Sequence, residues 1–233
     1  MKVAVIRFPG SNCDLDAVAA LEKIPGIAPE LVWHESTGIE GYDAVVVPGG
    51  FSFGDYLRAG SIAARSPAMT TIGRMAEGGT PILGICNGFQ ILVEAGLLPG
   101  ALLRNAGLNF VCKWTNVRVD NDETPFTRAA RQGQVLRMPI AHGEGRYYLS
   151  EEELRGLEKH HRVVFRYTDE MGRPVESSNP TGTAANIAGV SNQRGNVVGL
   201  MPHPERASDP ILSPFRSSDG ALVFESLLVG GPK

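Results

Sequence analysis

Short runs of apolar residues recur along the chain at intervals that a buried sheet requires. These runs are rich in Val and Ile and lack the polar alternation of a half-exposed strand, so they predict strands buried on both faces. They occupy residues 2–8, 43–47, 81–85 and 196–201. A further strand is expected before His34.

Amphipathic stretches separate or follow these apolar runs and predict helices. Gly78-Gly79 and Gly96 mark the ends of two of them, as glycine does beyond a helix terminus. Ser11 or Asn12 is expected to cap the first helix. The expected helices occupy residues 12–23, 62–77, 87–95 and 219–228.

Alternating strands and helices favour right-handed crossovers and a parallel sheet. Residues 101–148 differ, because segments such as Val111–Val119 alternate in polarity and predict antiparallel strands at an edge. The sequence therefore predicts one α/β domain over residues 1–233. Its sheet is doubly wound and mostly parallel with helices on both faces, and it carries an inserted antiparallel β region.

Composition narrows the class of protein. Of the 233 residues, 42% are hydrophobic and 20% are charged, which is ordinary for a soluble globular protein. The formal net charge of -3 and the lack of a basic stripe argue against nucleic acid as a partner. No apolar run is long enough for a signal-peptide core or a membrane span, so no membrane association is expected.

Cysteine usage points to a reducing cytoplasm. Cys13, Cys86 and Cys112 are far apart and odd in number, which argues against a disulfide framework and against a zinc site. No metal is therefore expected. The chain also lacks a G-x-x-x-x-G-K-[ST] phosphate loop, and residues 49–54 do not fit G-x-G-x-x-G, so nothing indicates that this chain handles ATP.

The most informative segment is Gly84-Ile85-Cys86-Asn87-Gly88, between an expected strand and an expected helix. It is the cysteine form of the G-x-S-x-G nucleophile elbow. The two glycines let strand and helix approach closely, and the helix amino terminus favours a thiolate. Without that strand–turn–helix context, a buried structural cysteine would be an equal alternative.

A thiolate nucleophile needs a base, and two histidines carry an acid two residues later. These are His142 with Glu144 and His203 with Glu205. His203 follows a buried strand between two prolines, whereas His142 lies in a glycine-flanked turn that suits a mobile contact loop. Because catalytic groups need tight placement, His203 and Glu205 are favoured as base and orienting acid.

An oxyanion hole needs two main-chain N–H groups. The residue after the nucleophile, Asn87, is the usual first donor, and Gly50 after the strand 43–47 is the candidate for the second. Taken alone, Gly49-Gly50 is an ordinary turn.

These residues together resemble the class I glutamine amidotransferases, whose triad joins an elbow cysteine to a late His-x-Glu. Segments 8–14, 48–60 and 142–146 resemble, more narrowly, the glutaminase subunits of phosphoribosylformylglycinamidine synthase in purine biosynthesis. The resemblance covers nearly the whole chain. It implies that Phe51 and Gln90 belong to the glutamine pocket.

The resemblance also implies a mechanism and partners. Cys86 would form a thioester with glutamine and release ammonia, with His203 moving protons. A large synthase subunit would use the ammonia, ATP and Mg to make formylglycinamidine ribonucleotide from formylglycinamide ribonucleotide, with a small accessory subunit also present.

A docking surface for that synthase is expected on the loop 51–60 and the turn 142–146. Both are glycine-flanked and combine charges with aromatic residues at strand ends, although ordinary exposed loops would show the same pattern. Its candidate residues are Arg58, His142, Glu144 and Arg146.

The sequence alone leaves two other interpretations of the function open. A γ-glutamyl hydrolase acting alone would use the same triad without a partner. A non-catalytic sensor or chaperone-like protein would keep the elbow cysteine, but His203-Pro204-Glu205 argues against it.

Overall fold

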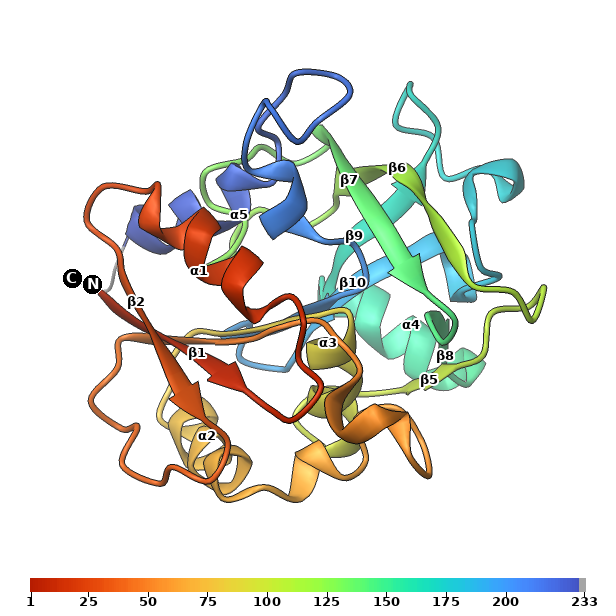
Figure 1. Ribbon diagram of the computed structural model, residues 1–233. Coiled ribbons are helices and arrows are strands. Elements are labelled where there is room, and N and C mark those ends of the chain that lie inside the picture. Colours follow the sequence, from red (N-terminus) through yellow and green to blue (C-terminus); the bar gives the residue numbers. More distant parts are fainter. Residues whose placement is uncertain (231–233) are drawn as a thin grey trace.

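A computed structural model describes residues 1–230 and shows a mixed nine-stranded sheet with helices packed against it (Figure 1). The strand order is β2-β1-β3-β4-β11-β10-β9-β6-β7, and β5 and β8 form a separate two-stranded sheet. The strands are β1 Lys2–Arg7, β2 Ala28–Trp33, β3 Ala44–Val47, β4 Ile82–Ile85, β5 Ala101–Leu103, β6 Val111–Val119, β7 Val135–His142, β8 Arg146–Tyr148, β9 Val163–Thr168, β10 Ile187–Ser191 and β11 Val197–Leu200.

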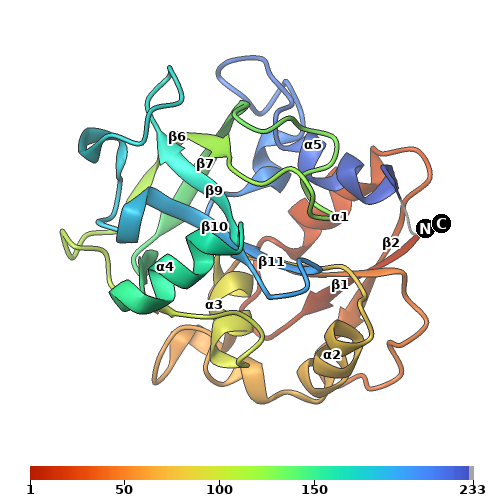
Figure 2. The same cartoon turned by 180° about the vertical axis from the view of Figure 1, so that it is seen from behind.

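The helices are short, and several connections contain 3₁₀ turns. Helices α1 and α5 lie on one side of the parallel half of the sheet, and α2 and α3 lie on the other (Figures 1 and 2). The α-helices are α1 Asp14–Glu22, α2 Pro67–Glu77, α3 Asn87–Glu94, α4 Glu151–Lys159 and α5 Ala221–Glu225. The 3₁₀ turns are η1 Ser52–Asp55, η2 Ala63–Arg65, η3 Glu176–Ser178, η4 Ala184–Asn186, η5 Pro204–Ala207 and η6 Ser226–Leu228.

The sheet changes character along its width. Strands β2, β1, β3, β4 and β11 are parallel, and β10, β9, β6 and β7 continue the same sheet in antiparallel fashion. The predicted α/β architecture with an antiparallel region is confirmed. The antiparallel strands extend the main sheet, and β7 forms its edge while β6 lies inside it.

Buried aliphatic side chains explain the parallel half. All four residues of each of β3, β4 and β11 are buried, so each of these strands is covered on both faces. Burial of a Val or Ile side chain contributes about 1.5–3 kcal/mol relative to exposure. The continuous apolar runs in the sequence follow directly from this two-sided burial.

Two predicted helices differ from the observed ones. The stretch 62–77 is broken into η2 and α2 at Ser66, whose ψ is 155°, because the residue before Pro67 is excluded from the helical region. At the start of α1 the capping position is Cys13, not Ser11 or Asn12, and no side chain caps it. The Ser11 hydroxyl instead accepts a hydrogen bond from the Phe8 N–H at 3.1 Å.

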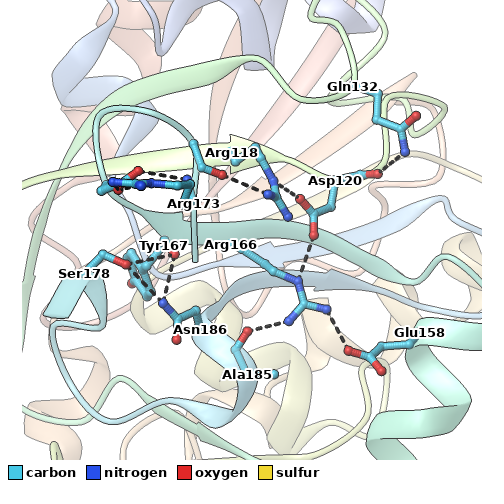
Figure 3. Close-up of polar contacts among 12 residues, drawn as sticks. Arg118, Asp120, Gln132, Glu158, Arg166, Tyr167, Arg173, Ser178, Ala185 and Asn186 are labelled. Atoms are coloured by element: carbon cyan, nitrogen blue, oxygen red, sulfur yellow. Dashed lines mark hydrogen bonds and ion pairs between the residues drawn. The ribbon is translucent and has the colours of Figure 1, made fainter. Parts of the chain in front are cut away.

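An ion-pair network crosses the antiparallel half (Figure 3). Arg118 on β6 and Arg166 on β9 are directly opposite each other, which alone would be repulsive. Asp120 accepts a hydrogen bond from the Nε of each, at 2.6 and 2.8 Å, and Glu158 on α4 accepts one from Arg166 at 2.9 Å. The network therefore joins β6, β9 and α4.

No helix within residues 1–230 combines the length and apolar character that crossing a membrane requires.

Candidate active site

Cys86 stands at a sharp turn between β4 and α3. Its φ of 51° and ψ of -104° are strained for a residue with a side chain. Its N–H still donates to the Leu200 carbonyl at 2.8 Å, so the turn begins while the strand is still paired. The thiol is buried and lies at the amino terminus of α3, where the helix dipole favours negative charge.

Glycines on either side make this turn feasible. A Cβ on Gly88 would lie 1.9 Å from the Val47 carbonyl oxygen, and one on Gly84 would lie 2.5 Å from a methyl group of Leu92. Either contact is far below van der Waals distance. Only glycine permits α3 to approach β3 and β4 this closely.

His203 and Glu205 reach the same place from the neighbouring strand. Strand β11 pairs in parallel with β4, with Leu200 beside Ile85, so both chains leave the sheet together. His203 follows β11, and its Nδ1 lies 2.5 Å from Glu205 Oε1 in η5. Both side chains are buried.

The charges around His203 stabilise its protonated form, the imidazolium. Burial alone would lower the pKa of His203, but the negative charges of Glu205 and Cys86 raise it well above its usual value. The His203 Nε2 atom has no hydrogen-bond partner within residues 1–230. That nitrogen is therefore free to exchange a proton with a thiol or a substrate.

The two expected oxyanion donors lie at the ends of β3 and β4. Asn87 is the first residue of α3, and Gly50 comes shortly after β3. Gly50 has a φ of 143°, and a Cβ there would lie 2.8 Å from the Ser11 Cα. Both residues thus lie in the loops beside the elbow, and Gly50 requires glycine for its backbone shape.

The expected pocket residues sit beside the first turn of α3. Gln90 is buried, and its Nε2 donates to the Glu144 carbonyl at 2.6 Å. Phe51 is 47% exposed on the loop after β3. Arg58 is exposed, whereas Glu144 and Arg146 are partly exposed.

The expectation that His142 belongs to an exposed contact turn is wrong. It is the last residue of β7 and is 3% exposed, since its imidazole packs over Gly145. Burial lowers its pKa to about 4, with a further contribution from His203. This low pKa keeps the ring neutral near pH 7, and the contact of its Nδ1 with Asn105 Oδ1 at 3.3 Å fixes its orientation.

Sequence reasoning did not assign a role to Cys13, which lies next to the His203–Glu205 pair. Ligand atoms of these three residues all lie within 4.8 Å of one another. Arg206 donates to Cys13 Sγ at 3.1 Å, and that positive charge opposes a bound cation. The only feature of the sequence that pointed to Cys13 was its place in the segment 8–14, which carries part of the family resemblance.

Comparisons with known proteins show which sequences this chain resembles. A family model described as a CobB/CobQ-like glutamine amidotransferase domain matches residues 1–226. The chain is 56% identical over 231 residues to phosphoribosylformylglycinamidine synthase subunit PurQ of Thermomicrobium roseum, covering 99% of this chain and 97% of that protein. It is 53% identical over 227 residues to the subunit of the same name from Methanosarcina acetivorans, covering 97% of each.

A solved structure is similar along the same length. A chain in the structure of PurLQS from Thermotoga maritima superposes with a TM-score of 0.84 at 45% sequence identity. The match covers 97% of both chains.

Proposed function

Because the chain belongs to the PurQ family of phosphoribosylformylglycinamidine synthase subunits, within the CobB/CobQ-like glutamine amidotransferases, we propose that it hydrolyses glutamine with a Cys86-His203-Glu205 triad. The ammonia passes to a synthase subunit that converts formylglycinamide ribonucleotide to formylglycinamidine ribonucleotide in purine biosynthesis. The observation that carries the proposal is the buried His203–Glu205 pair at the end of the strand beside the Cys86 elbow.

The reaction is acyl transfer through a thioester. Cys86 gives its thiol proton to His203, and the thiolate Sγ attacks the side-chain amide carbon of glutamine. The resulting oxyanion accepts hydrogen bonds from the N–H groups of Asn87 and Gly50. His203 donates a proton to the leaving nitrogen, and ammonia departs. Water then attacks the thioester with His203 as base, which releases glutamate and restores the thiol.

Glu205 keeps His203 oriented throughout this cycle. Its carboxylate holds Nδ1 and stabilises the imidazolium, so Nε2 stays directed to the reacting atoms. Gln90 and Phe51 contribute to the glutamine pocket. The position of Gln90, held against the Glu144 carbonyl one turn after the nucleophile, supports this role.

The protein works with partners in this proposal. The relative in the PurLQS structure assembles with other subunits, and we assign to this chain a large synthase subunit and a small accessory subunit. ATP and Mg belong to the synthase. Three free cysteines are consistent with a reducing cytoplasm as the site of action.

Replacement of Cys86 tests the proposal. Cys86→Ala removes the nucleophile, so glutaminase activity measured with the synthase present is expected to fall on the order of 10⁴-fold or more. Cys112→Ala is the matched control, because Cys112 is also free but exposed on β6, and it should keep parental activity. Glutamine turnover surviving in Cys86→Ala would refute the nucleophile assignment.

Omitting the synthase separates the other functions considered. Full turnover by the chain alone would identify a stand-alone γ-glutamyl hydrolase. No turnover under any condition, with intact folding, would indicate a non-catalytic sensor.

A further inference from the structure

Two carboxylates that the proposed mechanism does not use lie near each other beside the elbow. Asp55 ends η1, in the loop after β3, and Glu144 lies in the turn between β7 and β8. Burial, together with the charge of Glu144, raises the pKa of Asp55 to about 6. The two side chains are therefore close enough to repel each other.

Hydrogen bonds fix the Asp55 carboxylate and the main chain of Glu144 relative to the nucleophile. Asn87 Nδ2 donates to Asp55 Oδ1 at 3.3 Å and to Gln90 Oε1 at 2.9 Å. Gln90 Nε2 in turn donates to the Glu144 carbonyl at 2.6 Å. Since Asn87 and Gln90 belong to the first turn after Cys86, the Asp55 carboxylate and the backbone of Glu144 are tied to the elbow.

The carboxylates of Asp55 and Glu144 carry more negative charge than the neighbouring side chains neutralise. A polar group beside them also lacks a hydrogen-bond partner in the described part of the chain. Within residues 1–230, Asp55 has no ion-pair partner, and Glu144 has only Arg104 at 3.6 Å, a side chain that is 79% exposed. Ser52, whose N–H donates to Asn87 Oδ1, adds a buried hydroxyl without a partner. Leaving a buried hydroxyl or a half-buried carboxylate without a partner costs free energy.

We propose that Asp55 and Glu144 bind the α-ammonium group of glutamine and so select an α-amino acid as the substrate. The inference rests on the proposed glutaminase function. Glutamine carries one cationic group, and the hydrogen-bonded amides of Asn87 and Gln90 connect these acids to the elbow where its side-chain amide reacts. Asp55 then gains a counter-charge only when the substrate is bound.

An analogue without the amine tests this selection. Glutaramate has the same amide and carboxylate as glutamine but lacks the α-ammonium group. In the full chain with its synthase, Asp55→Asn should lower kcat/KM for glutamine roughly 10- to 100-fold, the effect of losing a hydrogen bond to a charged group. The kcat/KM for glutaramate should be unchanged. The preference for glutamine, the ratio of the two kcat/KM values, should therefore fall by the same factor.

Two further measurements keep the result interpretable. Glu144→Gln should reduce the same preference, whereas Glu40→Gln, an exposed acid paired with Arg74, should leave it intact. In the parent, KM for glutamine should rise as the pH falls through about 6, where Asp55 gains a proton, and Asp55→Asn should remove that rise. Glu144 and its partner Arg104 are the charged groups that face Asp55.

The outcomes separate this inference from the proposed function. Equal losses with both substrates in Asp55→Asn would mean that Asp55 only supports the loop, and the inference would be wrong. No change with either substrate would overturn it as well. Failure of the parent to hydrolyse glutamine with its synthase would instead overturn the proposed function.

Discussion

Gly88 controls the approach of α3 to the centre of the sheet. Its Cα lies so near β3 that an added Cβ would meet the Val47 carbonyl oxygen at 1.9 Å. A main-chain atom cannot move aside as the end of a flexible side chain can. The shape of the elbow around Cys86 therefore depends on the absence of one methyl group.

Gly88→Ala is expected to displace α3 from the sheet. Overpacking of this kind costs about 1–3 kcal/mol, and here the clash is with main chain, so we expect the upper part of that range. Glutaminase activity should fall more than stability, because the shift moves Cys86 relative to His203. Urea unfolding and activity assays on the same preparation measure both effects.

Gly73→Ala provides the control for this substitution. Gly73 is inside α2, and a Cβ there would meet nothing within 4 Å. Alanine is favoured over glycine in a helix by about 1 kcal/mol, so this variant should be slightly more stable and fully active. A destabilised Gly73→Ala would contradict the packing argument.

Among the elements, β6 and β9 depend on a shared carboxylate. Arg118 and Arg166 are cross-strand neighbours, and Asp120 bonds to both (Figure 3). The Asp120 and Arg166 side chains are 18% and 13% exposed, so solvent screens the interaction only in part. Without Asp120, Arg118 would lose its carboxylate partner and, within residues 1–230, Arg166 would keep only the partly exposed Glu158.

Asp120→Asn is therefore expected to lower the free energy of unfolding by about 2 kcal/mol. This is less than the 3–5 kcal/mol typical of a fully buried pair that loses one partner, because water reaches part of the network. The exposed pair of Glu151 and Arg155 on α4 offers a comparison, and Glu151→Gln should change stability by less than about 1 kcal/mol. Chemical denaturation measures both, and equal effects would argue against the network.

On the scale of the whole molecule, the loop after β3 presents a face suited to a partner. Tyr56 and Leu57 are 74% and 93% exposed there, next to Arg58. Large apolar side chains that stay in water beside charged ones are typical of protein interaction sites. The loop adjoins the candidate active site, since Asp55 bonds to Asn87.

Charge reversal tests whether this face binds the synthase. Arg58→Glu together with Arg146→Glu should weaken complex formation at least tenfold, because reversal places repulsive charges in the interface. Arg155→Glu, on the exposed face of α4, should leave it unchanged. Analytical ultracentrifugation with the synthase gives the affinities, and unaltered binding by the double variant would rule out this surface.

The sequence by itself determined the features that depend on neighbouring residues. Apolar runs marked β3, β4 and β11 because two-sided burial leaves no room for polar alternation. The G-x-C-x-G elbow could be recognised because its strand, turn and helix follow one another directly in the sequence. Even the break at Pro67 has a local cause, although the helical pattern across it concealed the break.

Only the tertiary structure decided which distant residues meet. Parallel pairing of β4 with β11 brings His203 and Glu205 to the elbow, and the same packing buries His142, which its glycine-rich surroundings had suggested was exposed. The Asp55 side chain and the Glu144 main chain are brought to the same turn of α3 by hydrogen bonds from Asn87 and Gln90. Burial and pKa are set by everything that surrounds a residue, so a pattern along one segment cannot reveal them.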